Sequence, residues 1–293
     1  MDAVVLNYND AATTIHFVES IQNYSCIERI VVVDNCSTDG SFETLCKYRN
    51  DKIIVIKTER NGGYGYGNNN GISFLVKNYN TRYIIISNPD VEVSEGTVAG
   101  CLNYLTKNPN CAVVAPMMKM KNMEKSYHCA WRIPSFCQYL FFSLVFLGKL
   151  GEKMYYGRNF LDGSGPVNVG CVAGSFLVVD AEKFVKAGLY DENIFLYCEE
   201  TTLGIRLRKV NYDSVLLRDL YFVHHHSISI NKSIQSVINQ KKLMWNSREY
   251  VLNHYYKNNF IRRFIIRLVK LVSLLEDRVY LKIKQFKLIE KKV

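Results

Sequence analysis

The sequence predicts an α/β fold built around a mostly parallel sheet, and two observations support this prediction. Short apolar runs rich in β-branched residues recur in the first half of the chain, at residues 4–6, 30–33, 53–56 and 83–86. Each run is apolar throughout, as in a parallel strand that is buried on both faces. Segments of helical length separate the runs, including residues 11–23 and 41–48. Ligands of such sheets bind beyond the carboxyl ends of the strands.

The excess positive charge is concentrated near the end of the chain. The sequence carries a formal charge of +10, and residues 257–293 account for +8 of it, with eleven Lys or Arg and three acidic residues. From about residue 246 the composition changes to basic and aliphatic residues without glycine, which predicts a helical C-terminal appendage. Because the rest is nearly neutral and the tail lacks the pattern of a nucleic-acid-binding module, we expect no nucleic-acid partner.

Cysteine usage and hydropathy indicate a cytoplasmic protein. The nine cysteines are odd in number and include no C-x-x-C pair, which favours free thiols in a reducing compartment over disulfides or a zinc site. No basic and then apolar leader opens the chain, so we expect no signal peptide. The longest apolar stretches, residues 139–147 and 264–275, are too short or too charged to cross a bilayer.

Six short motifs follow one another along the chain, several of them at the ends of predicted strands. They are V-V-L-N-Y-N, V-V-V-D-N-C-S-T-D-G, N-G-G-Y-G-Y-G-N-N, S-N-P-D-V, A-G-S-F-L-V-V and F-L-Y-C-E-E-T-T-L-G-I-R-L-R. In this order, residues 2 to about 230 resemble the inverting GT-A glycosyltransferases of the family 2 type, which include bacterial rhamnosyl- and galactofuranosyltransferases. The resemblance implies a Rossmann-like GT-A domain over residues 1–245, with a nucleotide-binding half at about 1–115 and an acceptor-binding half at about 116–245. Residues 246–293 would form a basic amphipathic helical segment.

The resemblance places a nucleotide-sugar donor at the ends of the first two strands. It implies that Asp34 contacts the base or ribose, with Asn7, Tyr8 and Ser37 beside it. The alternative is a structural role, because Asp and Ser at such positions also turn the chain and cap the next helix. For Ser37 this alternative is as well supported as donor binding.

Residues 62–67 hold four glycines, more than an ordinary loop needs. Glycine lets backbone amides come close to a diphosphate, and the N-terminus of a following helix favours its charge. We therefore predict that this segment binds the donor through Asn61, Gly62, Gly63 and Asn68. No Gly-Lys-Ser or Gly-Lys-Thr follows, so the segment is not a Walker A loop. A flexible connector is the alternative.

Asn88 and Asp90 stand where the family carries a D-x-D-like element, whose last acid binds a divalent metal. The resemblance implies that Asp90 is a ligand of Mn²⁺ or Mg²⁺, cations that prefer oxygen ligands and stabilise a leaving diphosphate. Asn88 replaces the first acid of the element and is assigned to the donor. By position His224 would complete the metal shell, whereas we expect capping or surface roles for His225 and His226.

Glu199 and Glu200 match the paired acids of the family, of which the second is the usual base. An inverting transfer needs one carboxylate to take the proton of the acceptor hydroxyl during attack on the anomeric carbon. We assign Glu200 as this base, and Glu199 as a neighbour that orients it or raises its pKa by repulsion. Complementing a helix dipole is the alternative. The sequence departs from the family at Glu200, usually Asp, and at Thr202, where a further Asp is common.

Two apolar segments are candidates for membrane contact. Residues 131–156 are aromatic and apolar, and they predict either a hairpin near a lipid carrier or a pair of core helices. In the tail, one helical face carries Arg263, Arg267 and Lys270. The other face carries aliphatic residues, namely Ile261, Ile265, Leu268, Val272 and Leu275. This layout is typical of a helix in the interface of an anionic membrane, and a docked helix with a wet basic face is the alternative.

These observations predict an inverting enzyme that moves rhamnose or another hexose from a dTDP- or UDP-sugar to a glycan acceptor. We expect the acceptor to be lipid-linked and destined for a cell-surface polysaccharide such as a capsule. The enzyme would work at the inner face of a bacterial cell membrane. The sequence does not decide between a monomer and a homodimer. Two alternatives remain, a catalytically degenerate scaffold of a polysaccharide assembly complex, suggested by Asn88 and Thr202, and a sugar nucleotidyltransferase. A nucleotidyltransferase usually has a basic, glycine-rich loop near its N-terminus, and none precedes Asn61.

Overall fold

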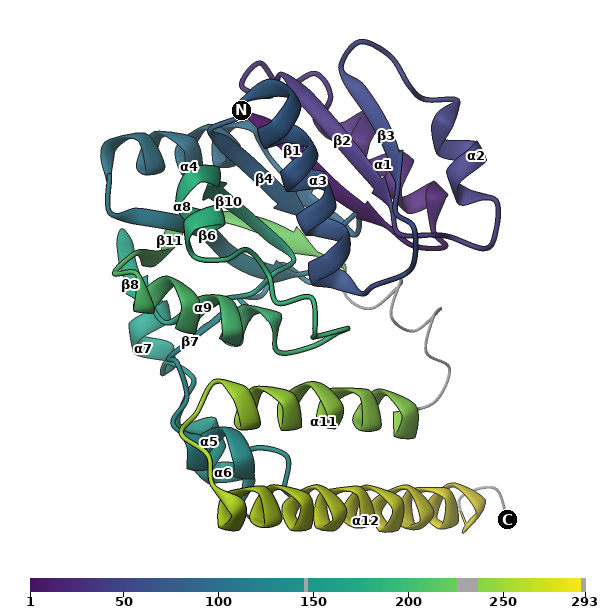
Figure 1. Ribbon diagram of the computed structural model, residues 1–293, viewed down its shortest axis with the longest axis vertical. Coiled ribbons are helices and arrows are strands. Elements are labelled where there is room, and N and C mark those ends of the chain that lie inside the picture. Colours follow the sequence, from purple (N-terminus) through teal and green to yellow (C-terminus); the bar gives the residue numbers. More distant parts are fainter. Residues whose placement is uncertain (145–146, 226–236, 291–293) are drawn as a thin grey trace. The chain divides into compact units, whose positions relative to one another are not determined.

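The computed structural model describes residues 1–144, 147–225 and 237–290, with the backbone alone described for residues 237–238 and 281–290. The chain divides into two compact units (Figure 1). The first, which we call the sheet unit, consists of Met1–Ile133 and Tyr155–Ser233. The second, which we call the helical unit, consists of Pro134–Met154 and Ile234–Val293. The predicted helical appendage is present, but its first helix starts at Val237, before the predicted boundary at residue 245. It also shares its unit with residues 134–154.

Within the described residues, a nine-stranded sheet forms the centre of the sheet unit. Its order is β3-β2-β1-β4-β10-β6-β11-β5, with β8 beside β11. The strands are β1 (Asp2–Asn7), β2 (Arg29–Asp34), β3 (Ile53–Lys57), β4 (Tyr83–Ser87), β5 (Val91–Val93), β6 (Cys111–Met120), β8 (Pro166–Val169), β10 (Phe176–Asp180) and β11 (Asp213–His224). A separate small sheet pairs β7 (Ala130–Trp131) with β9 (Cys171–Val172).

The large sheet is parallel throughout its first half, from β3 to β4, and mixed in its second half. β1 pairs in parallel with β2 and β4, β2 with β3, and β6 with β11. β10 is antiparallel to β4 and β6, and both β5 and β8 are antiparallel to β11. The predicted α/β fold with a mostly parallel sheet is therefore confirmed, and the four predicted apolar runs fall in β1 to β4.

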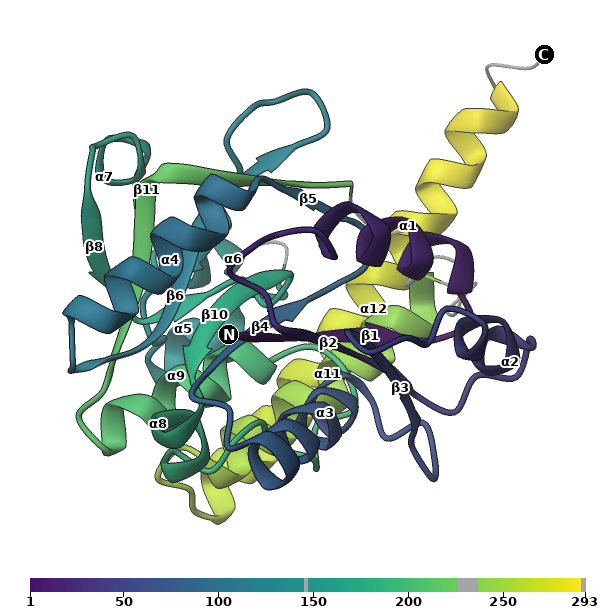
Figure 2. The same ribbon diagram turned by 90° about the horizontal axis from the view of Figure 1, so that it is seen from above.

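Helices cover both faces of the sheet (Figure 2). They are α1 (Ala11–Ile21), α2 (Ser41–Cys46), α3 (Tyr64–Tyr79), α4 (Glu95–Lys107), α7 (Arg158–Leu161), α8 (Ala181–Lys186) and α9 (Glu199–Lys209). Successive side chains of a strand enter opposite cores. Ala3 and Val5 belong to the core that contains α1 and α4, whereas Val4 belongs to the core that contains α3, α8 and α9. Burial on both faces explains why these strands are apolar throughout.

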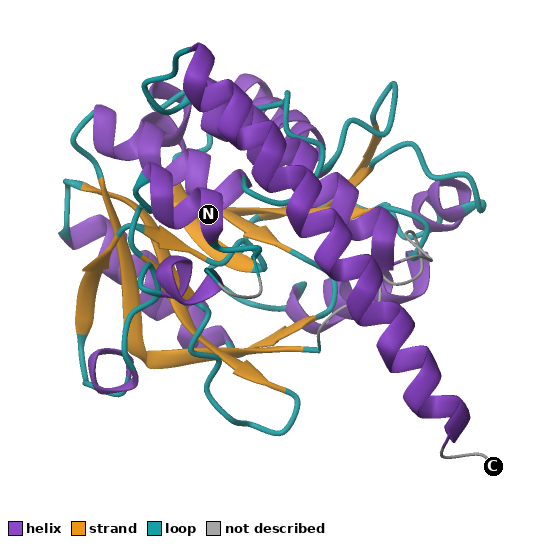
Figure 3. Cartoon of the chain, turned by 90° about the horizontal axis from the view of Figure 1, so that it is seen from below, coloured by secondary structure: helices purple, strands orange, loops and turns teal. Residues whose placement is uncertain are grey.

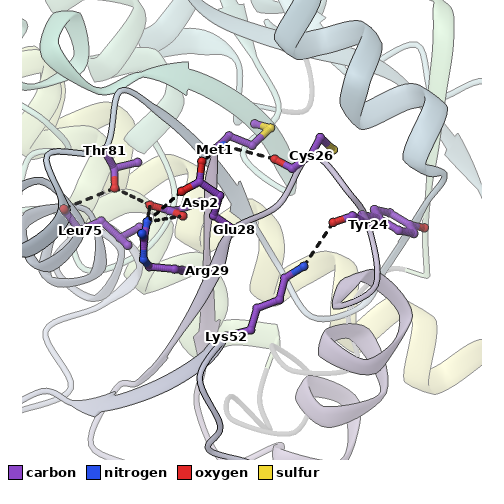
Figure 4. Close-up of polar contacts among 9 residues, drawn as sticks. All are labelled: Met1, Asp2, Tyr24, Cys26, Glu28, Arg29, Lys52, Leu75 and Thr81. Atoms are coloured by element: carbon purple, nitrogen blue, oxygen red, sulfur yellow. Dashed lines mark hydrogen bonds and ion pairs between the residues drawn. The ribbon is translucent and has the colours of Figure 1, made fainter.

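The amino-terminal edge of the sheet is closed by paired polar groups (Figure 4). The carboxylate of Asp2 is buried, and Arg29 Nη1 lies 3.3 Å from each of its oxygens. The hydroxyl of Thr81 donates to the same carboxylate, and Lys52 Nζ donates to the carbonyl of Tyr24 at 3.2 Å. The negative charge of the buried Asp2 is thus matched by Arg29 within the fold.

The helical unit contains two short helices and two long ones. They are α5 (Phe136–Phe141), α6 (Gly148–Glu152), α11 (Val237–His254) and α12 (Phe260–Glu290), the last being the long helix that runs toward the C-terminus in Figure 3. Tyr139 and Leu140 of α5 are buried with Trp245 of α11 and Ile266 of α12. The Tyr256 hydroxyl also donates to the Pro134 carbonyl at 2.7 Å. Of the two alternatives for residues 131–156, core packing therefore applies to α5.

None of the helices among the described residues combines the length and apolar character needed to cross a bilayer.

Candidate active site

The carboxyl ends of β1, β2 and β4 lie side by side at one edge of the sheet. Asn7 at the end of β1 is in register with Asp34 at the end of β2, and Val5 is in register with Ser87 at the end of β4. The polar residues that follow these strands therefore meet at one edge, where doubly wound sheets bind ligands. The predicted donor residues at this edge are Asn7, Tyr8, Asp34, Ser37 and Asn88.

A hydrogen-bond network fixes the loops after β1 and β2. The Asn7 side-chain amide donates to Asp34 Oδ1 at 2.9 Å and to Ser37 Oγ at 3.2 Å, and the Ser37 amide donates to Asp34 Oδ2 at 3.0 Å. Thr14 Oγ1 donates to Asn7 Oδ1 at 2.8 Å. Asp34 is 0% exposed, so a direct contact with a base or ribose would require this network to open. In this structure Asp34 joins the two loops, and its contact with the donor stays a prediction. Of the predicted donor residues after β1 and β2, Tyr8 and Ser37 are partly exposed.

The glycines of residues 62–67 lie at the start of α3, where they allow close packing. Gly63 has a φ of +91°, and a Cβ built there would lie 1.9 Å from the carbonyl oxygen of Phe195. A Cβ on Gly67 would lie 2.3 Å from Leu6 Cδ1 in β1. The segment is thus the beginning of a packed helix and not a flexible connector. Close helix packing, which sequence reasoning did not weigh, accounts for these glycines.

The predicted donor residues Asn61 and Asn68 make local hydrogen bonds in the same region. Asn61 Oδ1 accepts from the Asn35 side-chain amide at 3.0 Å and from the Gly63 amide at 3.1 Å. Asn68 is fully buried, and its side-chain amide donates to the Tyr64 carbonyl at 3.0 Å. Gly62 packs so tightly on Tyr66 that a Cβ would meet the ring at 2.4 Å. These contacts hold the start of α3, and Asn61 is the partly exposed residue among Asn61, Gly62, Gly63 and Asn68.

Asp90 and His224 are brought together by the pairing of β5 with β11. Val91 is in register with His224, and the His225 amide donates to the Asp90 carbonyl at 3.0 Å. This register places His224 Nε2 at 3.2 Å from Asp90 Oδ1, with Asp90 only 7% exposed. His225 Nε2 lies 2.8 Å from Glu92 Oε1 on the outside of the strand, and His226 lies outside the described residues.

The Asp90–His224 pair fits a divalent cation. Adjacent ligands of an octahedral ion with bonds of about 2.1 Å are about 3 Å apart, close to the observed separation of 3.2 Å. In the part of the chain that the structure describes, no group of three His, Cys, Asp or Glu could hold a metal by itself. A cation at this pair would therefore take its other ligands from the donor diphosphate and water.

Glu199 and Glu200 open helix α9 after an unusual backbone turn. Tyr197 and Cys198, just before them, have φ values of +69° and +76°, which non-glycine residues rarely adopt and which functional sites often hold. The two carboxylates that follow lie in different surroundings. Glu199 is 3% exposed, whereas Glu200 is partly exposed and its Oε1 accepts a hydrogen bond of 3.2 Å from the Gly174 amide.

The two acids differ in how they hold a proton. Burial raises the pKa of Glu200, while hydrogen bonds from the amides of Glu200 and Gly174 oppose the change. Burial and then repulsion from Glu200 raise the pKa of Glu199 well above its usual range. Glu199 Oε1 is buried without a hydrogen-bond partner among the described residues. The pKa of both carboxyls is therefore raised, and repulsion within the pair acts on both. Because Glu199 is the more buried of the two, we expect it to keep the shared proton and to leave Glu200 as the basic member.

Tyr64, from the glycine-rich segment, supports the loop that holds Glu200. Its hydroxyl donates to the Gly174 carbonyl at 2.6 Å, and the Gly174 amide in turn donates to Glu200. Burial, and secondly the charge of Glu200, raise the pKa of Tyr64, so its hydroxyl stays protonated and remains a donor. A Cβ on Gly174 would lie 3.1 Å from Glu200 Oε1 and 3.3 Å from Tyr64 Oη. A side chain at this position would therefore press on both groups, which would have to move by a few tenths of an ångström.

The Asp90–His224 pair and the Glu199–Glu200 pair are both connected to one short segment before β10. The Asn88 amide, in the turn that leads to Asp90, donates to the Ser175 carbonyl at 2.9 Å. The adjacent Gly174 holds Glu200. Two consecutive residues thus connect the end of β4 with the start of α9. The departure at position 202 is structural, because the buried Thr202 hydroxyl donates to the Glu199 carbonyl at 2.9 Å.

Comparison with known proteins assigns the chain to a family. The sequence pattern described as Glycosyl transferase family 2 matches residues 2–179, more than half of the chain. The chain belongs to glycosyl transferase family 2. The match contains every predicted donor residue and Asp90, whereas Glu199, Glu200 and His224 of this glycosyltransferase lie beyond it.

Several curated relatives of this glycosyltransferase transfer rhamnose or another hexose according to their names. The N-acetylglucosaminyl-diphospho-decaprenol L-rhamnosyltransferase of Mycobacterium tuberculosis is 26% identical over 212 residues, which cover 69% of this chain and 68% of the relative. The low-salt glycan biosynthesis hexosyltransferase Agl10 of Haloferax volcanii is 26% identical over 72% of this chain and 62% of its own length. The rhamnosyltransferase WbbL of Escherichia coli is 22% identical over 57% of this chain and 64% of its own length.

Solved structures share the fold of this glycosyltransferase. A mannosyltransferase from Pyrobaculum calidifontis in complex with GDP-Man and Mn²⁺ aligns with a TM-score of 0.55 at 13% identity, over 93% of this chain and 69% of that one. GalNAc-T7 with UDP, GalNAc and Mn²⁺ aligns with a TM-score of 0.61 at 14% identity, over 94% of this chain and 53% of that one. The GT-A fold predicted from the motifs is therefore confirmed.

Sequence reasoning missed the supporting residues Tyr64 and Gly174. Both stand inside quoted motifs, N-G-G-Y-G-Y-G-N-N and A-G-S-F-L-V-V, but 110 positions separate them and nothing in the spacing indicates that they touch. It also missed Trp131, whose indole donates to Thr201 Oγ1 at 3.3 Å beside the acid pair.

Proposed function

We propose that this glycosyltransferase moves one hexose, rhamnose or a close relative, from a dTDP- or UDP-sugar to a lipid-linked glycan, with inversion at the anomeric carbon. The strongest support is the setting of Glu200. Its carboxylate is partly exposed, oriented by the Gly174 amide and made more basic by burial. Gly174 is followed by Ser175, whose carbonyl accepts a hydrogen bond from the Asn88 amide in the turn that leads to Asp90. A base beside a diphosphate site is what inverting transfer requires.

In the proposed reaction, the acceptor hydroxyl oxygen forms a bond to the anomeric carbon from the side opposite the diphosphate. The bond from that carbon to the diphosphate oxygen breaks, and its electrons leave with the nucleoside diphosphate. The hydroxyl proton passes to Glu200. Burial and repulsion raise the pKa of Glu199, which favours its protonated form and leaves Glu200 to accept the proton. Asp90 and His224 would hold Mn²⁺ or Mg²⁺, and the bound cation would stabilise the negative charge of the leaving diphosphate.

The names of the relatives support the donor and acceptor classes. One relative is named for transfer of L-rhamnose to N-acetylglucosaminyl-diphospho-decaprenol, and another is a rhamnosyltransferase. By analogy we assign a lipid diphosphate-linked sugar as the acceptor and cell-surface polysaccharide as the destination. A lipid-linked acceptor resides in a membrane, so we place the reaction at the inner face of a bacterial cell membrane.

The test is a transfer assay with purified protein and Mn²⁺. The protein is incubated with dTDP-rhamnose or a UDP-hexose and with an N-acetylglucosaminyl-diphospho-polyprenol, and the products are weighed by mass spectrometry. We expect an acceptor heavier by one hexose residue and an equal amount of nucleoside diphosphate. A scaffold would give neither transfer nor hydrolysis of any donor. Release of pyrophosphate from a sugar phosphate and a nucleoside triphosphate would instead identify a nucleotidyltransferase.

A further inference from the structure

Over residues 260–280, whose side chains are described, one face of helix α12 packs on the rest of the helical unit. Ile266 and Ser273 on this face are fully buried and Val269 is nearly so. The Ser273 hydroxyl donates to the Ser143 carbonyl at 3.0 Å, which ties α12 to the segment after α5. Lys270 also faces inward and forms an ion pair of 2.7 Å with Glu249 of α11. The predicted basic face therefore loses Lys270, which serves helix packing.

A second face of α12 is apolar and exposed. Its residues recur every three or four positions and are between 48% and 66% exposed, and we call them the apolar stripe: Ile261, Phe264, Leu268, Leu271, Leu275 and Val279. The stripe spans 19 residues of the sequence, a length of about 28 Å along a helix. Large apolar side chains in so long an exposed row mark an interaction surface. Ile265, which we predicted on this face, is half-buried instead.

Arginines border the apolar stripe along one side. At 100° per residue, Arg263, Arg267 and Arg278 fall next to the stripe, and all three are exposed. The acid nearest in sequence, Asp277, is engaged by Lys241 at 3.4 Å. The segment from residue 257 to the end carries +8 in total. The exposed surface of α12 thus combines an apolar row with a positive border.

This combination fits an anionic lipid surface better than a second copy of the chain. The 3-4 spacing of the stripe would suit a coiled coil, but a second copy brings the same positive border and no complementary charge. Anionic headgroups supply that complement, and acyl chains accept the aliphatic row. We propose that α12 lies in the interface of an anionic membrane, with the apolar stripe among the acyl chains and Arg263, Arg267 and Arg278 at the headgroups.

Membrane docking extends the proposed function, because it holds the enzyme where a lipid-linked acceptor resides. It rests on the surface of α12 and not on the active site. Vesicle binding and transfer can therefore fail separately. Loss of transfer with intact vesicle binding would count against the proposed function alone, whereas the reverse would count against the membrane surface alone.

The test uses the full chain and vesicles of phosphatidylcholine with or without phosphatidylglycerol, separated by flotation. The unmodified protein should bind the anionic vesicles, and binding should weaken as salt rises from 0.1 M to 1 M because the Debye length falls from about 10 Å to about 3 Å. Leu268→Gln with Leu275→Gln should reduce binding by more than about tenfold. Arg263→Gln with Arg267→Gln should reduce it by roughly 30-fold at low salt, at about 1 kcal/mol for each charge.

Matched controls lie on the sheet unit. Val185→Gln removes an exposed aliphatic side chain, and Lys107→Gln with Lys121→Gln removes two exposed charges. These variants should bind vesicles as the unmodified protein does, and all variants should keep transfer to a water-soluble acceptor. Equal binding by the stripe variants and the controls would overturn the proposal. The oligomeric state is measured by light scattering without vesicles. A dimer that becomes a monomer in the variant with Leu268→Gln and Leu275→Gln would also overturn the proposal, because the stripe would then be a protein interface.

Discussion

Two buried carboxylates at opposite edges of the central sheet, those of Asp2 and Glu199, have opposite surroundings. At the amino-terminal edge, Asp2 is 2% exposed and is neutralised by Arg29 and by the Thr81 hydroxyl (Figure 4). At the carboxyl edge, Glu199 is 3% exposed, has a repelling carboxylate as its neighbour, and keeps one oxygen without a hydrogen bond among the described residues. Burying a carboxylate that has a charged partner costs little free energy of folding. Burying one without a partner disfavours its charged form and so raises its pKa. The unpaired carboxylate of Glu199 makes the carboxyl edge the candidate for the chemistry.

The largest effect should come from Glu200→Gln. Glutamine keeps the size of the side chain but cannot take a proton, so the rate of transfer should fall by roughly two to four orders of magnitude while donor affinity is retained. Single-turnover transfer and calorimetric titration of the donor measure the two quantities. Glu199→Gln is the matched control and should keep most of the activity. An inactive Glu199→Gln beside an active Glu200→Gln would show that the two roles are reversed.

Removing the proposed metal ligand should have the next largest effect. Asp90→Ala should weaken Mn²⁺-dependent binding of UDP or dTDP by more than roughly tenfold, because the cation loses a direct carboxylate ligand. Isothermal titration with and without Mn²⁺ provides the measurement. Glu92→Gln, two residues away and exposed, changes the same amount of charge and should leave binding intact. Unchanged affinity in Asp90→Ala would refute the assignment.

Tyr64→Phe should have a smaller effect that is confined to the rate. It removes the hydroxyl that donates to the Gly174 carbonyl, so the amide that orients Glu200 is held less firmly. We expect kcat to fall roughly threefold to tenfold, the equivalent of one hydrogen bond, with KM for the donor unchanged. Tyr66→Phe on the same helix is the control. A rise in KM with constant kcat would mean that Tyr64 serves donor binding instead.

The smallest effects concern stability and should have opposite signs at the two edges. Asp2→Asn should lower the free energy of unfolding by about 1–3 kcal/mol without changing kcat, because Arg29 and Thr81 lose their charged partner. The pKa of Glu199 is raised in the folded state, so its ionisation costs stability above its unfolded pKa of about 4.3. Glu199→Gln should therefore keep or increase stability at pH 7, and any gain should disappear below pH 4. Urea unfolding at both pH values tests this, and equal destabilisation by the two variants would remove the contrast.

The sequence was a good guide to whatever depends on local pattern. The apolar runs of β1 to β4, the polar residues at their ends and the acids at the start of α9 are all encoded over a few neighbouring residues. The fold and the edge that carries the site could therefore be predicted. The individual roles of the site residues remain predictions.

Contacts between distant segments could not be predicted. The glycines of residues 62–67 pack on Leu6 and Phe195, and Tyr64 reaches Gly174, because the tertiary fold brings those segments together. Likewise, no local signal indicates that residues 134–154 belong with the C-terminal helices. Which of two adjacent acids keeps the proton depends on burial, and that also follows from packing.

The pH dependence of transfer tests the central claim, that Glu200 is the base at the carboxyl edge. A protonated Glu200 cannot accept the acceptor's proton, so kcat/KM should fall as the pH falls through the pKa of Glu200. Because burial raises that pKa, the midpoint of the acidic limb should lie above the usual glutamate value of about 4.3. In Glu200→Gln the limb should disappear and leave a low rate that does not change over the same range. A limb that persists in Glu200→Gln would contradict the account, because another group would then be the base.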